Sequence, residues 1–242
     1  MDSISVNKFI SSTGFCSRRA ADKLLDEGRV KINGVLAKKG NRVEAGDLVT
    51  VDGNPIESQT ELVYLLLNKP VGITCTTDLK DKDNIIDFIN YPSRIFPVGR
   101  LDKPSQGLII MTNDGDIVNK ILRAGNAHEK EYIVTVTKPI TNQFIKGMSN
   151  GVPILGTMTK KCSVKKINAN NFSIILTEGM NRQIRRMCEY YDYKVSRLKR
   201  TRIMHLSLKG IANGKWRHLT DEEVKQLKQA VQYSSKTEEA SK

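Results

Sequence analysis

The order of apolar and polar residues predicts strands and short helices from residue 62 onward. Continuous apolar runs at residues 62–67 and 108–111 are typical of strands buried on both faces, whereas residues 129–136 alternate as a half-buried strand does. Further strands are expected at residues 95–98, 161–167, 172–177 and 194–202, and helices at residues 83–89, 114–122, 140–148, 181–190 and 220–233. This pattern predicts an α+β domain with a large, mostly antiparallel sheet flanked by helices.

The first 58 residues have the pattern of a separate, smaller αβ module. Ser17 can cap a helix over residues 18–25, which Gly28 ends. An Asn33-Gly34 turn between two short apolar runs predicts a hairpin, and residues 46–51 predict one more strand. We therefore expect an N-terminal domain at residues 1–58, a second domain at residues 59–233 after a polar linker, and a disordered tail at residues 234–242.

The charge balance indicates a polyanionic partner. Lys and Arg number 39 against 26 Asp and Glu, a formal net charge of +13, which favours nucleic acid first and an anionic membrane surface second. No apolar run approaches the roughly 18 residues of a membrane span, and the N-terminus lacks a signal pattern, so we expect a soluble, cytoplasmic protein. Four scattered cysteines without a CxxC pair favour neither a zinc site nor a disulfide framework.

One carboxylate has a setting that suits chemistry. Asp102 lies in the predicted loop between the strands at 95–98 and 108–111, among residues Gly99, Pro104 and Gly107. A loop held from both sides can present a partly desolvated carboxylate to a ligand. Asp is also a common turn former, so a purely structural role stays open at this point.

Two basic clusters occur in the second half of the chain. Residues 181–186 place three arginines at a predicted helix start, and residues 194–202 alternate charged and apolar side chains as a half-buried strand would. Positive charge at a helix start opposes the helix dipole by roughly 0.3 to 1 kcal/mol per charge. Stability does not explain this arrangement, so something negative should meet the arginines, either phosphate or a buried carboxylate.

The N-terminal module resembles the S4 RNA-binding domain. The resemblance rests on Lys8-Phe9-Ile10, on Gly14–Arg19, on Gly28–Gly34 and on Gly46-Asp47, which occur in the expected order. It implies that the helix start and the hairpin contact the RNA backbone by shape. The residues that would do so are Arg18, Arg19, Lys23 and Lys31.

The larger domain resembles the S4-containing branch of the bacterial ribosomal pseudouridine synthases. The motifs are Asn68-Lys69-Pro70-x-Gly72, Gly99-Arg100-Leu101-Asp102-x-x-Ser105-x-Gly107-Leu108, Glu129-Lys130-Glu131-Tyr132 and Asn181–Arg186. The segments 119–132 and 151–156 are similar to the group of large-subunit synthase F in particular. The resemblance implies an isomerase that detaches uracil from C1′ of a uridine in RNA, turns it and rejoins it through carbon, without cofactor or metal.

The resemblance also implies roles for individual residues. Asp102 would be the essential carboxylate, acting either as nucleophile at C1′ or as base at C2′, and Arg185 would hold it charged by a planar two-pronged contact. Arg100 would help to extrude the uridine. Tyr132 would pack on the base and serve in the later proton step, and Leu198 would form part of an apolar floor. Lys69 would support the site from the rim of a turn after the first strand. The backbone of the RNA would contact Arg182, Arg186, Arg197, Lys199 and Arg200, with Lys160, Lys161, Lys165 and Lys166.

The expected substrate is ribosomal RNA, a stem-loop of 23S rRNA in particular, with tRNA as a possible second substrate, acted on by a monomer without membrane contact. Two other classes stay open on the sequence. A non-catalytic S4-type assembly factor would share the charge and the fold but should have lost Asp102, Tyr132 or Arg185, which are all present. A glycosidase or nucleosidase would also cleave a glycosidic bond but normally needs a pair of carboxylates.

Overall fold

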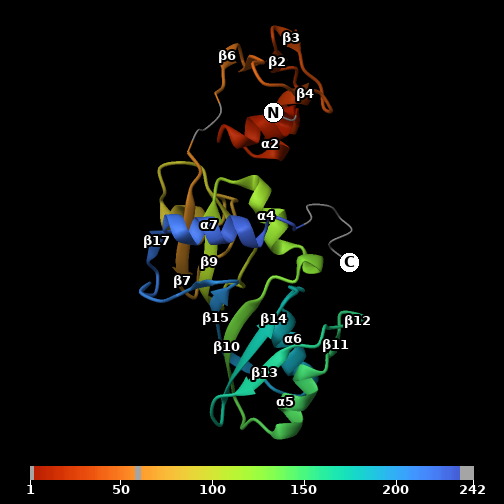
Figure 1. Ribbon diagram of the computed structural model, residues 1–242, viewed down its shortest axis with the longest axis vertical. Helices are drawn as coiled ribbons and strands as arrows, with labels where there is room; N and C mark the ends of the chain where they lie inside the picture. The colour runs from red at the N-terminus through yellow and green to blue at the C-terminus, as the bar shows by residue number, and fades with distance from the viewer. Residues whose placement is uncertain (1–2, 58–60, 235–242) are drawn as a thin grey trace. The chain divides into compact units, whose positions relative to one another are not determined.

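The computed structural model describes residues 3–57 and 61–234 (Figure 1). The chain divides into two compact units. The first contains the residues up to Leu62 and the segment Pro92–Arg94, and the second contains Val63–Tyr91 and the residues from Ile95 onward. The boundary expected at residue 58 and the tail expected after Ser234 fall on residues 58–60 and 235–242, which lie outside the described residues.

The first unit is built from short elements around a small apolar core. Its order is β1 (Ile4–Ser5), α1 (Val6–Ser12), α2 (Arg18–Asp26), β2 (Val30–Ile32), β3 (Val35–Leu36), β4 (Arg42–Val43), β5 (Val49–Val51) and β6 (Asn54–Pro55). The predicted cap is present, since Ser17 accepts a hydrogen bond from the Ala20 amide. The predicted hairpin β2–β3 is also present, and Asn33 takes the left-handed conformation that its turn needs.

Helix α1 was not predicted from the sequence. Ser5 precedes it without making a side-chain cap, and the helix has neither an acidic first turn nor a basic last turn. It forms because Val6 and Ile10 are fully buried against Ala21 and Leu25 of α2. Tertiary packing rather than local signals therefore determines this helix.

The second unit has a nine-stranded sheet with the order β13-β14-β10-β15-β9-β7-β17, to which β16 and β8 pair at β15 and β9. Its strands are β7 (Tyr64–Lys69), β8 (Phe96–Val98), β9 (Gln106–Thr112), β10 (Lys130–Val136), β13 (Ser163–Lys166), β14 (Asn171–Leu176), β15 (Val195–Ile203), β16 (Leu206–Ser207) and β17 (Trp216–His218). Within the described residues, all strand pairs of this sheet are antiparallel except β15 with β9. The predicted α+β fold with a mostly antiparallel sheet is confirmed.

Helices cover both faces of this sheet. They are α3 (Ile85–Ile89), α4 (Gly115–Leu122), α5 (Asn142–Ser149), α6 (Gln183–Tyr190) and α7 (Asp221–Ala230), with the short elements η1 (Ala124–Asn126), β11 (Pro153–Ile154) and β12 (Thr157–Met158). Leu66 and Ile110 face a core with α4 and α7, whereas Leu65 and Ile109 face a larger core with α3, α5 and α6. Helix α7 lies across β7 and β9 in Figure 1.

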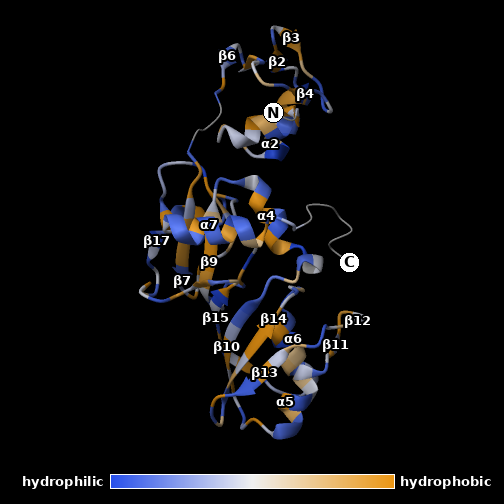
Figure 2. Cartoon of the chain, viewed as in Figure 1, coloured by the Kyte–Doolittle hydropathy of each residue, from blue (hydrophilic) through white to orange (hydrophobic). Residues whose placement is uncertain are grey.

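The two-sided burial explains the apolar runs. Strands β7 and β9 are coloured as hydrophobic in Figure 2, and nearly all their residues are buried. Strand β10 instead alternates, with Lys130, Tyr132, Val134 and Val136 buried and the residues between them more exposed. The side chains of this buried face meet those of β15 across an antiparallel pairing. That junction carries the candidate site.

Candidate active site

The loop that carries Asp102 is fixed from several directions. It joins the antiparallel strands β8 and β9, and the Ser105 amide donates to the Asp102 carbonyl at 2.9 Å. The Gly72 amide donates to the Lys103 carbonyl at 2.9 Å, and the Leu101 amide donates to Cys75 Sγ at 3.3 Å. Because the backbone on both sides is bonded, the carboxylate is held in place while 35% of its side chain stays exposed.

Arg185 approaches this carboxylate from helix α6. Its side chain is only 10% exposed, and Nε lies 3.8 Å from Asp102 Oδ2. Nη1 donates to the Val195 carbonyl, and Nη2 donates to the Pro104 carbonyl and to Ser105 Oγ. Burial lowers the pKa of Arg185, while the charge of Asp102 opposes that shift.

These contacts correct the predicted two-pronged pairing. The expected fork would place two guanidinium nitrogens on the carboxylate, but both terminal nitrogens bond the loop and β15 instead. The charges of Arg185 and Asp102 do form an ion pair. Arg185 therefore holds the position of the loop as well as facing its carboxylate.

Asp102 opens onto a cleft of about 870 Å³ within the second unit. Tyr132 of β10 and Leu198 of β15 lie in its wall, 8% and 6% exposed, and Leu176 of β14 adds to the apolar surface. Arg185 lines the cleft from α6. The structure thus brings together the carboxylate, the arginine, the aromatic ring and the leucine that the sequence motifs predicted for the site. The volume is in the range of ligand pockets.

Two arginines of the predicted set lie at the exposed edge of this cleft. Arg100 follows the turn at Gly99, and Arg182 precedes α6 in the left-handed conformation, with φ of 50°. Neither is buried, so both can meet an anion that stays in solvent. Arg186 does not line the cleft, since its Nε and Nη2 donate to Asn181.

Two further predictions on basic residues are wrong. Lys69 does not lie at a rim, because it is fully buried and its Nζ donates to the Pro70 and Ile73 carbonyls, each at 2.8 Å. Burial lowers its pKa. Arg200 is not an exposed contact for the RNA backbone, since it is 4% exposed, lines the cleft, and donates from Nε to the Leu108 carbonyl at 2.7 Å.

The other basic residues of β15 differ from Arg200. Arg197 is exposed and Lys199 is half-buried, so they remain accessible. Arg202, within the same predicted run, pairs at 2.9 Å with Glu129 and with Glu131. In the first unit, Arg18, Arg19, Lys23 and Lys31 are all exposed, and Lys23 lies 3.7 Å from Glu27.

Lys130 belongs to the motif Glu129-Lys130-Glu131-Tyr132, but the sequence predicted no role for it. It is 7% exposed and lines the cleft on the same face of β10 as Tyr132. Its Nζ donates to the His128 carbonyl at 3.1 Å. Burial lowers its pKa from 10.5 to about 8, and the charge of Arg200 adds to the shift. The period-two pattern of residues 130–136 was the signal that could have located it.

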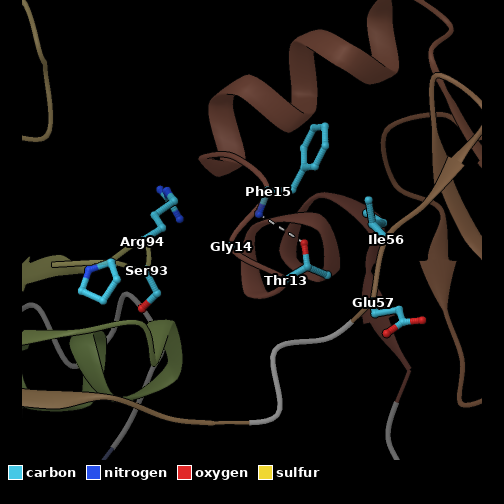
Figure 3. Close-up of a pocket in the computed structure, with 8 residues that line it drawn as sticks. Thr13, Gly14, Phe15, Ile56, Glu57, Ser93 and Arg94 are labelled. Atoms are coloured by element: carbon cyan, nitrogen blue, oxygen red, sulfur yellow. Dashed lines mark hydrogen bonds between the residues drawn. The ribbon is translucent and has the colours of Figure 1, made fainter.

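A second pocket belongs to the first unit, near the turn after α1. Figure 3 shows the Phe15 amide donating to Thr13 Oγ1 beside it. Glu57 and Arg94 line it, but the predicted site residues do not. Within residues 3–57 and 61–234 we find no cluster of three or more metal-ligating side chains. Over the same residues, no helix has the length and apolar character to cross a membrane.

Comparison with known proteins matches both units. The model of the RNA pseudouridylate synthase family matches residues 63–190, and that of the S4 domain matches residues 6–49. The dual-specificity RNA pseudouridine synthase RluF of Salmonella typhi is 59% identical over 232 residues, which cover 95% of this chain and 80% of the relative. Ribosomal large subunit pseudouridine synthase B of Bacillus subtilis (strain 168) is 35% identical over 232 residues, 92% and 95% of the two chains.

A solved structure of a pseudouridylate synthase has the same fold as this chain. The crystal structure of a pseudouridylate synthase superposes with a TM-score of 0.69 at 28% identity, covering 93% of this chain and 99% of that chain. The fold, the cleft around Asp102 and the sequence relatives therefore lead to one assignment, which confirms the resemblance drawn from the motifs. This chain belongs to the RNA pseudouridine synthase family and is an isomerase of that family with an S4 domain before its catalytic domain.

Proposed function

We propose that this enzyme converts a specific uridine of ribosomal RNA to pseudouridine, with 23S rRNA as its substrate and a tRNA as a second one. The names of the relatives support this choice, since one is a ribosomal large subunit synthase and another is a dual-specificity synthase. The enzyme acts in the cytoplasm as a monomer. The observation that carries the proposal is the fixed Asp102 loop beside Arg185, open to a cleft with an aromatic wall.

The geometry supports a sequence of steps. The target uridine leaves its stack and enters the cleft, while the exposed side chain of Arg100 stays at the edge where the RNA must open. The base packs on Tyr132 and Leu198. Asp102 then acts on the ribose, either as nucleophile at C1′ or as base at C2′. Both roles need the ionised carboxylate, which the charge of Arg185 favours.

The atoms balance without a cofactor. The C1′–N1 bond breaks with its electron pair left on the base, the base turns, and a C1′–C5 bond forms. C5 then loses its proton and N1 gains one, so that product and substrate are isomers. Asp102 is restored at the end. An enzyme of this kind releases no free uracil, which distinguishes it from a nucleosidase.

The two domains divide the recognition of RNA. The exposed Arg18, Arg19, Lys23 and Lys31 of the first unit contact the backbone and supply affinity without sequence choice. Arg182, Arg197 and Lys199 add such contacts around the cleft. Specificity comes from the folded shape of the RNA around the target loop. A non-catalytic assembly factor is the weaker candidate, because it has no use for an ordered carboxylate in an open cleft.

Mapping of pseudouridine across all RNAs tests the proposal. We would compare cells with the gene, cells without it, and cells that carry the Asp102→Asn variant. We expect one or a few sites in 23S rRNA and a tRNA to disappear without the gene and to stay absent with the variant. An unchanged map would contradict the substrate assignment, and release of free uracil by the purified enzyme would contradict the reaction.

A further inference from the structure

The cleft holds more buried positive charge than its two carboxylates, Asp102 and Glu178, can balance, since three buried basic side chains line it and neither carboxylate is buried. Among the residues that the structure describes, the buried charged side chains are Lys69, Lys130, Arg185 and Arg200, and all four are basic. Lys130, Arg185 and Arg200 line the cleft. Lys69 does not, but the charge of Asp102 raises its pKa against the larger effect of burial. Asp102 pairs with Arg185, and Glu178 accepts hydrogen bonds from the Lys160 amide and from Gln183 Nε2. Such an excess is costly unless an anion is bound there during the reaction.

The side chains of Arg185 and Lys69 hydrogen-bond to the surrounding protein, whereas Lys130 and Arg200 each keep hydrogen-bond donors that have no partner in the part of the chain that the structure describes. Arg185 bonds the loop and β15, and Lys69 bonds two carbonyls of the turn after β7. Within the described residues, the Lys130 ammonium makes one hydrogen bond, to the His128 carbonyl. Arg200 bonds through Nε, while its Nη2 is buried without a hydrogen-bond partner among the described residues. Each of the two therefore keeps donors for a ligand.

The positions of Lys130 and Arg200 favour the base over a phosphate. Arg200 is directly opposite Tyr132 across the β10–β15 pairing, and Lys130 is on the same buried face of β10 as Tyr132. Tyr132 and Leu198 make this part of the cleft apolar and aromatic, as suits a base. Phosphates of the RNA stay hydrated, and the exposed Arg100 and Arg182 at the edge can meet them.

We propose that Lys130 and Arg200 bind the detached uracil and stabilise the negative charge that it carries. The proposal rests on the proposed function, because it concerns the same reaction. When the C1′–N1 bond breaks, the electron pair stays on the base and spreads over N1 and the exocyclic oxygens. Hydrogen bonds from the buried Lys130 and Arg200 side chains to those oxygens stabilise that charge. The base leaves as an anion in either role of Asp102, so the assignment does not depend on that choice.

Substitutions of Lys130 test this role. Lys130→Met should slow pseudouridine formation by about 100-fold in single-turnover reactions at saturating enzyme, which is the effect of removing one such donor. RNA affinity should change by less than about 3-fold, because the contact forms with the detached base. Lys225→Met, on the exposed part of α7 outside the cleft, is the matched control and should keep the wild-type rate.

Two further measurements separate this role from a structural one. The Met variant should melt no lower than wild type, because it removes a buried charge. Lys130→Arg should keep a rate within about 10-fold of wild type at pH 7. The wild-type rate should fall above pH 8, as Lys130 loses its proton, and the rate of the Arg variant should not.

The proposal is overturned if Lys130→Met keeps a rate within about 5-fold of wild type, or if its defect is a loss of affinity that lower salt relieves, which is the behaviour of a phosphate contact. It is also overturned if the Arg variant keeps the alkaline fall in rate. Should the Met variant fail to fold, the pH profile of the Arg variant decides. A wild-type enzyme that forms no pseudouridine would contradict the proposed function instead.

Discussion

Two sets of basic residues in this protein differ in how much their charges cost the stability of the fold and in which part of the RNA they can contact. The exposed set is Arg18, Arg19, Lys23 and Lys31 of the first unit, and the buried set is Lys69, Lys130, Arg185 and Arg200 of the second. Exposed side chains keep their hydration, so they meet phosphate at little cost to stability. Buried ones lose hydration and need carbonyls or a ligand. From this difference we propose that the exposed set serves affinity, whereas Lys130, Arg185 and Arg200 of the buried set serve the reaction.

The carboxylate at the centre of the buried set gives the largest expected effect. Asp102→Asn keeps the shape of the side chain but removes its charge and its ability to act as nucleophile or base. We expect pseudouridine formation to fall by about 1000-fold or more, while the dissociation constant for RNA changes by less than 10-fold. Rapid-quench assays and binding titrations with one RNA would measure both. A rate near that of wild type would exclude Asp102 from the chemistry.

The buried set also depends on the close approach of β9 to β15. Gly107 has φ of +115°, and a Cβ atom there would lie 2.2 Å from the Arg200 carbonyl oxygen. Gly107→Ala should therefore destabilise the second unit by about 3 kcal/mol or more, as substitutions at crowded backbone positions do, and should abolish activity. Urea unfolding measures the change.

Gly115→Ala is the control for that substitution. Gly115 is the first residue of α4, and its Cβ atom would lie 3.9 Å from the Phe96 ring, which is an ordinary contact. Alanine also favours a helix, so stability should stay the same or rise. Equal stability losses in the two variants would contradict the importance of the β9–β15 approach.

Lys130 makes the stability of the protein depend on pH in a defined direction. Its pKa falls from 10.5 in the unfolded chain to about 8 in the folded protein. Between these values the unfolded state binds more protons, so this residue makes stability rise with pH. The penalty of the buried charge is fully present below about pH 8, and Lys130→Met should remove about 1–3 kcal/mol of it.

Unfolding curves at pH 7 and pH 10 measure that difference. The Met variant should be more stable than wild type at pH 7, and the gap should narrow at pH 10. A variant that is less stable at pH 7 would indicate that Lys130 has a structural role and that the comparison of the two basic sets does not hold for it.

The exposed set gives the smallest effect. Arg18→Ala combined with Arg19→Ala should weaken RNA binding by about 10-fold at moderate salt and reduce the slope of log affinity against log salt by about 1 per lost phosphate contact. The single-turnover rate at saturating enzyme should not change. An unchanged slope would show that these arginines do not contact phosphate.

Much of the fold follows from the sequence because local patterns decide it. The two-sided burial of β7 and β9 produces apolar runs, and the framed loop of Asp102 follows from the residues Gly99 and Gly107 around it. The Ser17 cap is a local signal too. These features need no knowledge of distant contacts, and their predictions are confirmed.

The positions of Lys69 and Arg200 could not be predicted in this way. Arg200 lies in a run where Arg197, Lys199 and Arg202 are also charged, so hydrophobic periodicity does not indicate which face is buried. Its burial comes from the parallel pairing of β15 with β9, which joins residues far apart in the chain. Lys69 is buried for a similar reason, since it pairs with Gly107 of β9 and its Nζ donates to the Pro70 and Ile73 carbonyls in the turn after β7.

A charge-preserving pair of substitutions tests the contrast between the two sets most directly. Arg185→Lys and Arg19→Lys both keep a positive charge, but only the first removes a guanidinium that bonds Val195, Pro104 and Ser105 while facing Asp102. Single-turnover rates at saturating enzyme would be measured at two salt concentrations. We predict a loss of about 100-fold for Arg185→Lys at both salts and no change for Arg19→Lys. A near-normal rate for Arg185→Lys, or a defect that low salt relieves, would return Arg185 to the general RNA-binding surface and contradict the account.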